Sequence, residues 1–426
     1  MRILHVWRRP YPFDIRVDKI SRTLAQDGHE VHILAANAGN EPTLERENGL
    51  TIHRLPALRG VPRSVSRATT YPTAWNPRWL RALLEACTRT RPEVLLVRDV
   101  QLALPCLAIR SALHIPLVLD LPEHWPAVIS IWRQTEGLCL RNLFTRSVAM
   151  FTAAERIAAL HADHVLVCVE EMVDRMVRIG VPRDRVHLVR NTPDLVAYPR
   201  LDSGQALRAA RIRAALESRF VVAYAGELDL FRGIDVLLRA IARLRQQIPS
   251  IRLLCIGPGK PRNLDVLHEL CRELDLGNNV SFTGWLDQQV MLDHLAASDV
   301  CVAPFHRCEH IDHTLSNKIF DYMSLGKPFV ATEAVPICRL LSEVKCGIAV
   351  QSRDVGALEQ ALRSLLDPIR RERLGREGLR AVREQYNWQL TDGPTLARLF
   401  QHIAATRLAT EDRSRIGTRP HLERRC

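Results

Sequence analysis

Aromatic residues and paired cysteines are scarce in this chain of 426 residues. Aromatic residues make up 5% of it, and its arginines form no block with interleaved rings. Proteins that hold single-stranded nucleic acid need such rings for base stacking, so this class is disfavoured. The 11 cysteines include no Cys-x-x-Cys pair, which fits a reducing compartment better than a disulfide framework.

Long hydrophobic runs are also missing. The longest apolar region, residues 94–121, is interrupted by Arg98, Asp99 and Arg110, so it cannot supply the ~20 apolar residues of a membrane span. The apolar run at the N-terminus is too short for a signal peptide. We therefore expect a cytoplasmic protein.

The net charge is strongly positive, +12 with a pI of about 9.5. Such a chain attracts nucleic acid, anionic lipid or a polyanionic small substrate. No nucleic-acid recognition motif is present, so we expect no nucleic-acid partner. Peripheral attachment to an anionic inner membrane leaflet stays open, with residues 59–81 as the contact segment or, alternatively, as an ordinary covering loop and helix.

Apolar runs that fit buried strands alternate with helical patterns along the whole chain. The runs span residues 3–7, 31–35, 94–97, 117–120, 164–168, 186–189, 220–225, 251–256, 280–283, 300–303, 329–331 and 347–350. Continuous apolar runs are typical of parallel sheets covered on both faces. The alternation predicts an α/β fold with two Rossmann-like, doubly wound domains.

The alternation pauses in a turn-rich stretch over residues 191–204, which we take as the linker. We expect an N-terminal domain over 1–196 and a second domain over 205–388. A C-terminal helix over 389–406 is expected to pack back on the N-terminal domain, with a basic, mobile tail over 407–426. Two such domains imply a cleft between them, where ligands usually bind.

The sharpest chemical signals lie in the second half. The strand that ends at Ala225 is followed by Glu227, Arg232 and Gly233, a strand-to-helix turn whose N–H groups favour an anion. Arg232 would neutralise a diphosphate there, or it is a surface arginine in an ordinary loop. Gly257 permits close approach of a ligand to the backbone.

Known nucleotide motifs are incomplete or absent. A dinucleotide fingerprint would need a third glycine where Arg262 stands. No Gly-x4-Gly-Lys-Ser/Thr loop exists either, which disfavours an NTPase.

A helix is predicted to start after Ser316 and to stop at Gly326. Lys318 in its first turn opposes the helix dipole, which suggests an anionic ligand nearby. Asp321 shares a face with Lys318 and would accept the hydroxyls of a ribose. The alternative is a surface ion pair of little energetic value.

Histidines at 306, 310 and 313 precede this helix. Their spacings of 4 and 3 would suit zinc on one helix face, but a polar loop that faces the ligand is the preferred interpretation. We expect no metal.

Taken together, these motifs resemble glycosyltransferase family 4, the retaining GT-B enzymes, over nearly the whole chain. The quoted segments are Gly226 with Arg232-Gly233, residues 253–259, V-S-F-T-G-W at 280–285, A-S-D-V at 297–300 with Pro304, and S-N-K-I-F-D-Y-M-S-L-G-K-P at 316–328. In the first half, Y-P-F-D-I-R-V at 11–17, G-H-E-V at 28–31 and V-R-N-T-P-D at 189–194 resemble the branch that builds polysaccharides.

The resemblance implies roles for individual residues. Arg232 occupies the position that contacts the donor diphosphate, and Lys318 lies beside the same pocket. Asp321 corresponds to the second acid of the family's E-x7-E motif, which holds the ribose. The donor-binding set is completed by Gly233, Gly257, Ser316 and Asn317.

Two positions depart from the family, because His313 replaces the first acid and Glu227 replaces an arginine; we still assign both to the donor site. In the N-terminal domain, which the resemblance makes the acceptor side, His124 is the candidate that faces the donor sugar, with Glu123 second. The alternative is that His124 caps its loop.

The resemblance therefore implies a hexosyltransferase of polysaccharide biosynthesis. It would move a sugar with retention from a UDP-, GDP- or ADP-sugar to a glycan or lipid-linked acceptor, without metal or cofactor. The alternatives are a nucleotide-sugar epimerase of the same fold and a nucleotide-sugar-binding scaffold whose catalysis has decayed.

Overall fold

The computed structural model describes residues 1–12, 14–37, 39, 41–56, 60, 76–136, 147–196, 203–218 and 220–417. The chain forms two compact units. Unit 1 comprises Met1–Val167, Val173–Val189 and Asp392–Cys426, and unit 2 comprises Cys168–Met172 and Arg190–Thr391. Most of the basic segment 59–81 that we considered for membrane contact lies outside the described residues.

Unit 1 is built on an eight-stranded sheet in the order β3-β4-β2-β1-β5-β6-β7-β8, parallel except for β3. The strands are β1 (Arg2–Pro10), β2 (Glu30–Ala36), β3 (Leu44–Glu47), β4 (Leu50–Arg54), β5 (Val94–Arg98), β6 (Leu117–Leu121), β7 (His164–Val167) and β8 (Val186–Leu188). Every residue of β5 and β6 and residues 3–7 of β1 are buried, as expected for strands covered on both faces.

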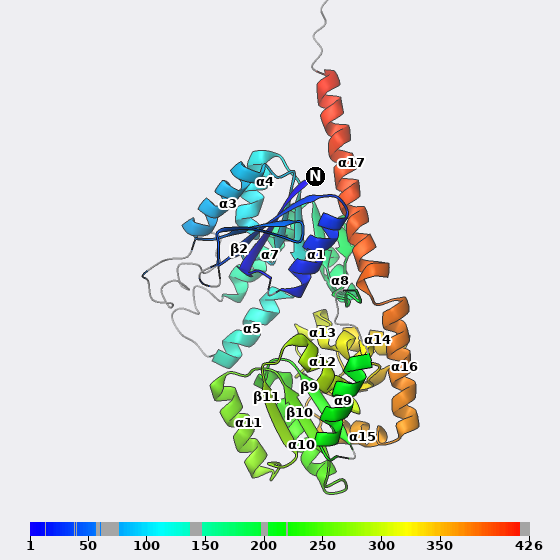
Figure 1. Ribbon diagram of the computed structural model, residues 1–426. Coiled ribbons are helices and arrows are strands. Elements are labelled where there is room, and N and C mark those ends of the chain that lie inside the picture. The colour runs from blue at the N-terminus through cyan, green and yellow to red at the C-terminus, as the bar shows by residue number, and fades with distance from the viewer. Residues whose placement is uncertain are drawn as a thin grey trace, which may run out of the picture. The chain divides into compact units, whose positions relative to one another are not determined.

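The helices of unit 1 connect these strands (Figure 1). They are α1 (Ile15–Gln26), α3 (Pro77–Thr90), α4 (Ala103–Leu113), α5 (Trp125–Glu136), α7 (Val148–His161), α8 (Glu170–Arg178), which begins in unit 2, and η1 (Arg183–Arg185). The side chain of Asp14 caps α1 by accepting from two backbone N–H groups, which fixes the entry to that helix.

Unit 2 contains a six-stranded, fully parallel sheet in the order β11-β10-β9-β12-β13-β14. Its strands are β9 (Val221–Ala225), β10 (Arg252–Ile256), β11 (Val280–Gly284), β12 (Val300–Ala303), β13 (Phe329–Thr332) and β14 (Gly347–Val350). The strand order reverses between β9 and β12, and ligands of doubly wound folds bind beside the carboxyl ends of strands at such a point.

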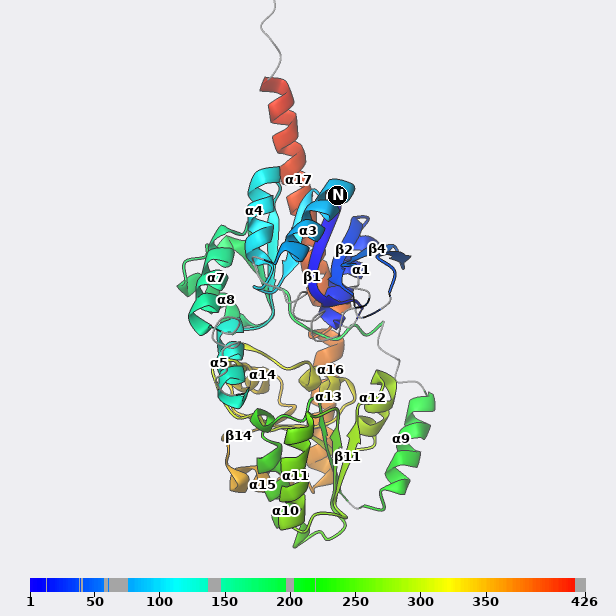
Figure 2. The ribbon, with the colours of Figure 1, turned by 90° about the vertical axis from the view of Figure 1, so that its left-hand side faces the viewer.

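The helices of unit 2 cover both faces of its sheet. They are α9 (Ser203–Ala215), η2 (Leu230–Arg232), α10 (Ile234–Arg245), α11 (Pro261–Glu273), α12 (Gln288–Ala296), η3 (Ile311–His313), α13 (Asn317–Ser324), α14 (Val335–Glu343), α15 (Val355–Ser364), α16 (Pro368–Glu384) and η4 (Trp388–Asp392). Figure 2 shows α10 close to α11 and α15, with both of which it packs.

A long C-terminal helix, α17 (Gly393–Gly417), belongs to unit 1 and packs along α1 (Figure 1). Gln401 donates to the Asp27 carboxylate, and the Arg407 guanidinium donates to the Glu93 carbonyl. The helix continues past residue 406, into the stretch that we expected to be a tail. Residues 418–426 lie outside the described residues.

All twelve strands expected from the apolar runs are present, and the doubly wound α/β prediction is confirmed. Two elements differ from expectation. The β3–β4 hairpin was missed because β3 is exposed and highly charged. The turn-rich stretch was taken to reach residue 204, but α9 already begins at Ser203. None of the helices in the described part of the chain combines the length and hydropathy of a membrane-spanning segment.

Candidate functional site

Lys318 is a buried cation at the carboxyl edge of the unit 2 sheet. It stands in the first turn of α13, its side chain is 7% exposed, and its Nζ has no hydrogen-bond partner among the described residues. The nitrogen lies 3.9 Å from the ring centroid of Tyr224 and 4.9 Å from that of Phe305. The alternative of a surface ion pair with Asp321 is therefore wrong, because Lys318 is buried and forms no such pair.

Arg232 lies beside Lys318 at the end of η2. Its guanidinium carbon is 4.6 Å from the Phe231 ring centroid and 5.3 Å from that of Phe305, which Lys318 also contacts. Its Nε is buried without a hydrogen-bond partner within the described ranges. The side chain is half-buried, so Arg232 is not the freely exposed arginine of an ordinary loop.

The charge of Arg232 and the burial of Lys318 act on the pKa of Lys318 in the same direction. Burial lowers the pKa of Lys318 well below its ordinary value, the charge of Arg232 lowers it further, and Asp321 opposes the shift. No carboxylate lies within ion-pair distance of Lys318 or Arg232 in the part of the chain that the structure describes. An anion placed between them would satisfy both buried donors and remove the mutual repulsion.

Two glycines allow the loops of this edge to approach one another. A Cβ on Gly233 (φ +73°) would lie 1.8 Å from the Pro304 carbonyl oxygen, and a Cβ on Gly257 would lie 2.2 Å from the Gly226 oxygen. Both glycines are thus required for packing of the backbone. A Cβ on Gly226 would lie 2.7 Å from the Lys318 Nζ, so the absence of a side chain there leaves room for the ammonium group.

The remaining donor-site candidates of unit 2 sit around this pair. Ser316 is the N-cap residue of α13 without a side-chain cap bond, Asn317 is exposed, and Asp321 is buried one turn further on. Glu227 is exposed, and its carbonyl accepts from the Tyr224 hydroxyl. The donor-site role of these residues stays a prediction, and Glu227 itself is exposed to solvent.

The histidine-rich loop lies next to Phe231 and Arg232, but its histidines do not share one helix face. His306 pairs with Asp235 at 3.3 Å, and the His313 Nδ1 lies 2.8 Å from the Glu309 carbonyl oxygen. Burial, helped by Arg232 and His313, lowers the pKa of His310 to about 4. Among the described residues no three His, Cys, Asp or Glu side chains converge on a point where a metal ion would be coordinated.

In unit 1, Glu123 and His124 follow β6 directly. His124 immediately precedes α5 and is 2% exposed, and its carbonyl accepts from the Val128 N–H at the start of that helix. Glu123 is half-buried. Both residues lie at the carboxyl edge of the unit 1 sheet.

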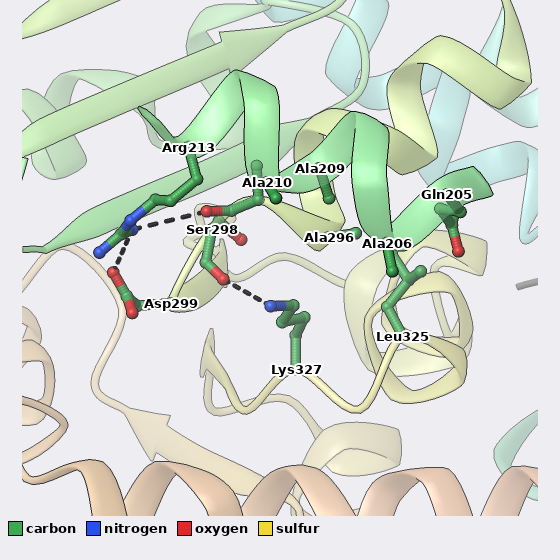
Figure 3. Close-up of a pocket in the computed structure, with 11 residues that line it drawn as sticks. Gln205, Ala206, Ala209, Ala210, Arg213, Ala296, Ser298, Asp299, Leu325 and Lys327 are labelled. Atoms are coloured by element: carbon green, nitrogen blue, oxygen red, sulfur yellow. Dashed lines mark hydrogen bonds and ion pairs between the residues drawn. The ribbon is translucent and has the colours of Figure 1, made fainter. Parts of the chain in front are cut away.

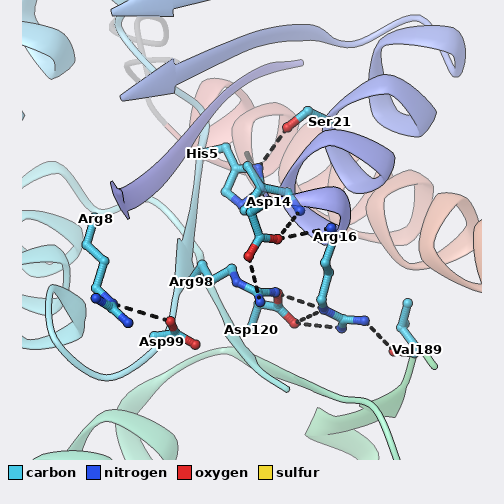
Figure 4. A network of polar contacts seen from close by, with 10 residues as sticks. His5, Arg8, Asp14, Arg16, Ser21, Arg98, Asp99, Asp120 and Val189 are labelled. Atoms are coloured by element: carbon cyan, nitrogen blue, oxygen red, sulfur yellow. Dashed lines mark hydrogen bonds and ion pairs between the residues drawn. The ribbon is translucent and has the colours of Figure 1, made fainter. Parts of the chain in front are cut away.

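The strongest feature of that edge is a buried charge network that sequence reasoning missed (Figure 4). Asp120 is fully buried and accepts from the Arg16 Nη2 at 2.7 Å and from the Arg98 Nη1 at 3.2 Å. Arg98 also pairs with Asp14 at 3.2 Å, and Arg16 donates to the Val189 carbonyl at 2.9 Å. Burial alone would raise the pKa of Asp120, but Arg16 and Arg98 more than offset it and hold that pKa below its ordinary value.

Aromatic rings extend this network toward His124. The Arg98 guanidinium lies 5.2 Å from the Trp7 ring, and that of Arg8 lies 4.9 Å from the Trp125 ring and 3.5 Å from Asp99. The sequence contains one signal of this network, the Asp-x-Arg-Val segment at 14–17, which we quoted only for its resemblance to the family. Its arginine bonds a carboxylate 104 positions away, a pairing that sequence spacing does not reveal.

A pocket of about 550 Å³ in unit 2 contains none of the predicted site residues (Figure 3). Alanines of α9 and α12 form much of its wall, and Lys327 donates to the Ser298 carbonyl at 2.7 Å inside it. This bond ties the segment after α13 to the start of β12. The pocket is separate from the pair of cations.

Comparison with known proteins identifies the class of protein to which the chain belongs. Residues 14–192 match a family model described as glycosyl transferase 4-like domain, and residues 219–368 match one described as glycosyl transferases group 1. A glycogen synthase of Mycobacterium tuberculosis is 24% identical over 409 residues, which cover 91% of this chain and 92% of that protein.

Solved structures agree on the fold. A sucrose-phosphate synthase of Thermosynechococcus elongatus superposes with a TM-score of 0.77 at 20% identity, covering 95% of this chain and all of that one. Anabaena HepE, solved in complex with UDP, gives 0.71 at 14% identity, with 95% and 100% covered. The chain is therefore a glycosyltransferase with the GT-B fold. It combines a glycosyltransferase 4-like N-terminal half with a group 1 C-terminal half.

Proposed function

We propose that this glycosyltransferase is a retaining member of family 4 that moves a hexosyl group from a nucleoside-diphosphate sugar to a glycan or lipid-linked acceptor. The observation that supports it is the pair Arg232 and Lys318, two adjacent cations whose buried nitrogens lack hydrogen-bond partners in the described ranges. A diphosphate supplies the negative charge and the acceptor oxygens that this pair lacks. Neither an epimerase nor a decayed scaffold is favoured by the relatives.

The transfer breaks the bond between the anomeric carbon and the diphosphate oxygen, whose electron pair stays on that oxygen. Negative charge grows there, and Arg232 and Lys318 stabilise it in a site from which water is largely excluded. Because two fixed cations perform this task, we propose that no metal is needed. Full activity in EDTA is the expected result, and loss of activity that Mg²⁺ restores would contradict it.

The acceptor oxygen forms the new bond to the anomeric carbon and loses its proton. We assign the handling of protons near the sugar to His124, with Glu123 beside it, because an imidazole accepts or donates near neutral pH. The Arg16–Asp120–Arg98 network holds the strand from which the loop of His124 leaves. Asp321, buried one turn after Lys318, is proposed to accept the ribose hydroxyls.

The decisive variant is Arg232→Ala. Loss of one fixed donor at a developing oxyanion lowers the rate by about 10²–10³-fold, so kcat/KM for transfer of a labelled sugar should fall by that factor. Arg373→Ala, an exposed arginine of α16, is the matched control and should retain activity. Unchanged turnover in Arg232→Ala, with folding verified by circular dichroism, removes this residue from the mechanism.

The donor is to be identified by thermal stabilisation with UDP-, GDP- and ADP-sugars, since a ligand that binds only the folded state raises its stability. An epimerase would convert the stabilising sugar nucleotide without any acceptor. A decayed scaffold would bind it and neither transfer nor hydrolyse the sugar. Either outcome would overturn the transferase proposal.

We also propose peripheral attachment to the inner membrane leaflet, based on the net charge of +12. Co-sedimentation with anionic vesicles that weakens as salt rises is the expected result. Equal recovery with neutral and anionic vesicles would contradict the attachment.

A further inference from the structure

A second polar pocket lies in unit 1, at the amino-terminal edge of its sheet. It has a volume of about 1,000 Å³, and it is lined by residues just before or at the start of β6, β7 and β8 and by one face of α17. Ligands of doubly wound folds normally bind at the opposite, carboxyl edge, where Glu123 and His124 stand. Neither the family resemblance nor the proposed transfer reaction uses this pocket.

The acidic groups of the pocket do not balance its basic groups. Asp163 is already neutralised, because it accepts from Arg110 at 2.6 and 3.0 Å and from the Leu117 N–H at 2.8 Å. Arg185 is exposed, and its guanidinium has no hydrogen-bond or ion-pair partner among the described residues. Asp184 is the other acid of the lining, and the Arg407 guanidinium adds a further positive charge.

Two histidines on neighbouring strands face this positive surface. The His164 Nδ1 lies 3.1 Å from the His187 Nε2, so the two imidazoles share one proton. Burial lowers the pKa of His164, with His402 and Arg185 adding to the shift and Asp163 and Asp184 opposing it. Burial also lowers the pKa of His187, to about 4, with His164, Arg183 and His402 adding to the shift and Asp184 opposing it. Both shifts favour the neutral imidazoles, and an anion beside the pair would favour uptake of a proton.

The rest of the lining suits a ligand larger than a bare ion. Ile115, Pro116 and Ile403 give apolar wall, and Ser111 and Thr406 carry hydroxyl groups. A volume of about 1,000 Å³ is at the upper end for small-molecule sites, and inorganic phosphate would fill only a small part of it. Arginine and imidazole donors next to hydroxyls match the chemistry of a phosphorylated sugar.

We propose that this pocket is a binding site for a phosphate monoester of a sugar or a similar polyol, separate from the donor site. The phosphate is bound by Arg185 and the His164–His187 pair. Because α17 contributes His402 and Thr406 to the lining, the bound ester also holds α17 more firmly against the sheet of unit 1.

The test uses the full chain with Arg232→Ala, so that phosphate binding at the proposed donor site is suppressed. Glucose 6-phosphate and inorganic phosphate are titrated by calorimetry at constant ionic strength. We expect saturable binding with the ester tighter than phosphate, and a loss of affinity on the order of tenfold or more in Arg185→Gln, since a hydrogen bond to a charged group has been removed. Arg178→Gln, an exposed arginine of α8 outside the pocket, is the matched control and should bind like the parent.

A second measurement follows the imidazole signals of His164 and His187 by NMR across pH. Glucose 6-phosphate should raise their titration midpoints in the parent and in Arg178→Gln, but not in Arg185→Gln. Absence of saturable binding, equal affinity in Arg185→Gln, or equal affinity for phosphate and ester would overturn the proposal. Arg185-dependent binding of phosphatidylglycerol vesicles without binding of the soluble ester would assign the pocket to a lipid headgroup and would also overturn it.

Discussion

Replacing Lys318 by methionine should make the ligand-free protein more stable while it weakens donor binding. Lys318 is 7% exposed, and its Nζ lacks a hydrogen-bond partner in the described ranges. Leaving a buried donor unsatisfied costs about 1–3 kcal/mol. The contacts of the nitrogen with the rings of Tyr224 and Phe305 return about 0.5–2 kcal/mol when the amine is charged. Methionine keeps the packing against both rings without the amine.

The net gain should therefore be on the order of 1 kcal/mol in the free energy of unfolding. For a unit of roughly 200 residues, this corresponds to a rise in Tm of about 2–4 °C. Unfolding in urea, with the ligand-free proteins compared at one pH, gives the free energy directly. Lys345→Met is the control for the chemical change itself, because Lys345 is exposed and should show no comparable gain.

The gain should also depend on pH in a defined direction. The pKa of Lys318 is lower in the folded protein than its ordinary value of 10.5, so between the two values the unfolded chain binds a proton that the folded chain lacks. The contribution of Lys318 to the free energy of unfolding therefore rises with pH through that window. The destabilisation that Lys318 causes is largest below its folded pKa. The advantage of Lys318→Met should shrink as the pH approaches 10.5.

The same variant should weaken donor binding. A diphosphate favours the charged amine, so binding should take up protons in the parent, which calorimetry in buffers of different ionisation enthalpy detects. Loss of a hydrogen bond to a charged group costs about 1.5–3 kcal/mol, equal to a roughly 10- to 150-fold higher Kd. If Lys318→Met is less stable than the parent at pH 7 and binds the nucleotide equally well, the reasoning about this site is refuted.

Three further predictions concern the scaffold and the acceptor side. Asp120→Asn should lower the free energy of unfolding by about 3–5 kcal/mol, because it leaves Arg16 buried without its carboxylate and Arg98 with Asp14 alone; Asp174→Asn, at an exposed position, should unfold at a urea concentration close to that of the parent. Gly233→Ala should destabilise unit 2 by more than the ~1–3 kcal/mol of backbone strain, since its Cβ also meets the Pro304 carbonyl; Gly277→Ala, with open space around it, should not. His124→Ala should reduce kcat by about 10²–10⁴-fold with little change in donor KM, and unaltered kcat would exclude it as the proton carrier.

The fold was largely predictable because its strands are covered on both faces. Continuous apolar runs such as Val94–Val97 are too short for a buried helix and fit a buried strand. All of these runs are strands in the structure. The β3 strand escaped prediction because three of its four residues are charged and because Leu44, Arg46 and Glu47 are exposed at the sheet edge. The helix α9 escaped because its alanines and arginines form no apolar stripe.

One part of the candidate site could be proposed from the sequence because a local rule is broken there. Lys318 opposes its helix dipole, and from this conflict the sequence predicts an anionic ligand; the structure adds that the ammonium group is buried without a hydrogen-bond partner in the described ranges. The Arg16–Asp120 pair breaks no local rule, and its partners are brought together only by the strand order. The same holds for His164 and His187, which meet because β7 pairs with β8.

The most direct test compares how strongly the protein distinguishes a nucleoside diphosphate from the corresponding monophosphate. Isothermal titration of UDP and UMP, or of the guanosine or adenosine pair if the donor screen selects it, gives the ratio of the two Kd values. We predict a large preference for the diphosphate in the parent and a ratio near one in the double variant Arg232→Ala, Lys318→Met. An equal preference in both proteins would contradict the role of these two cations.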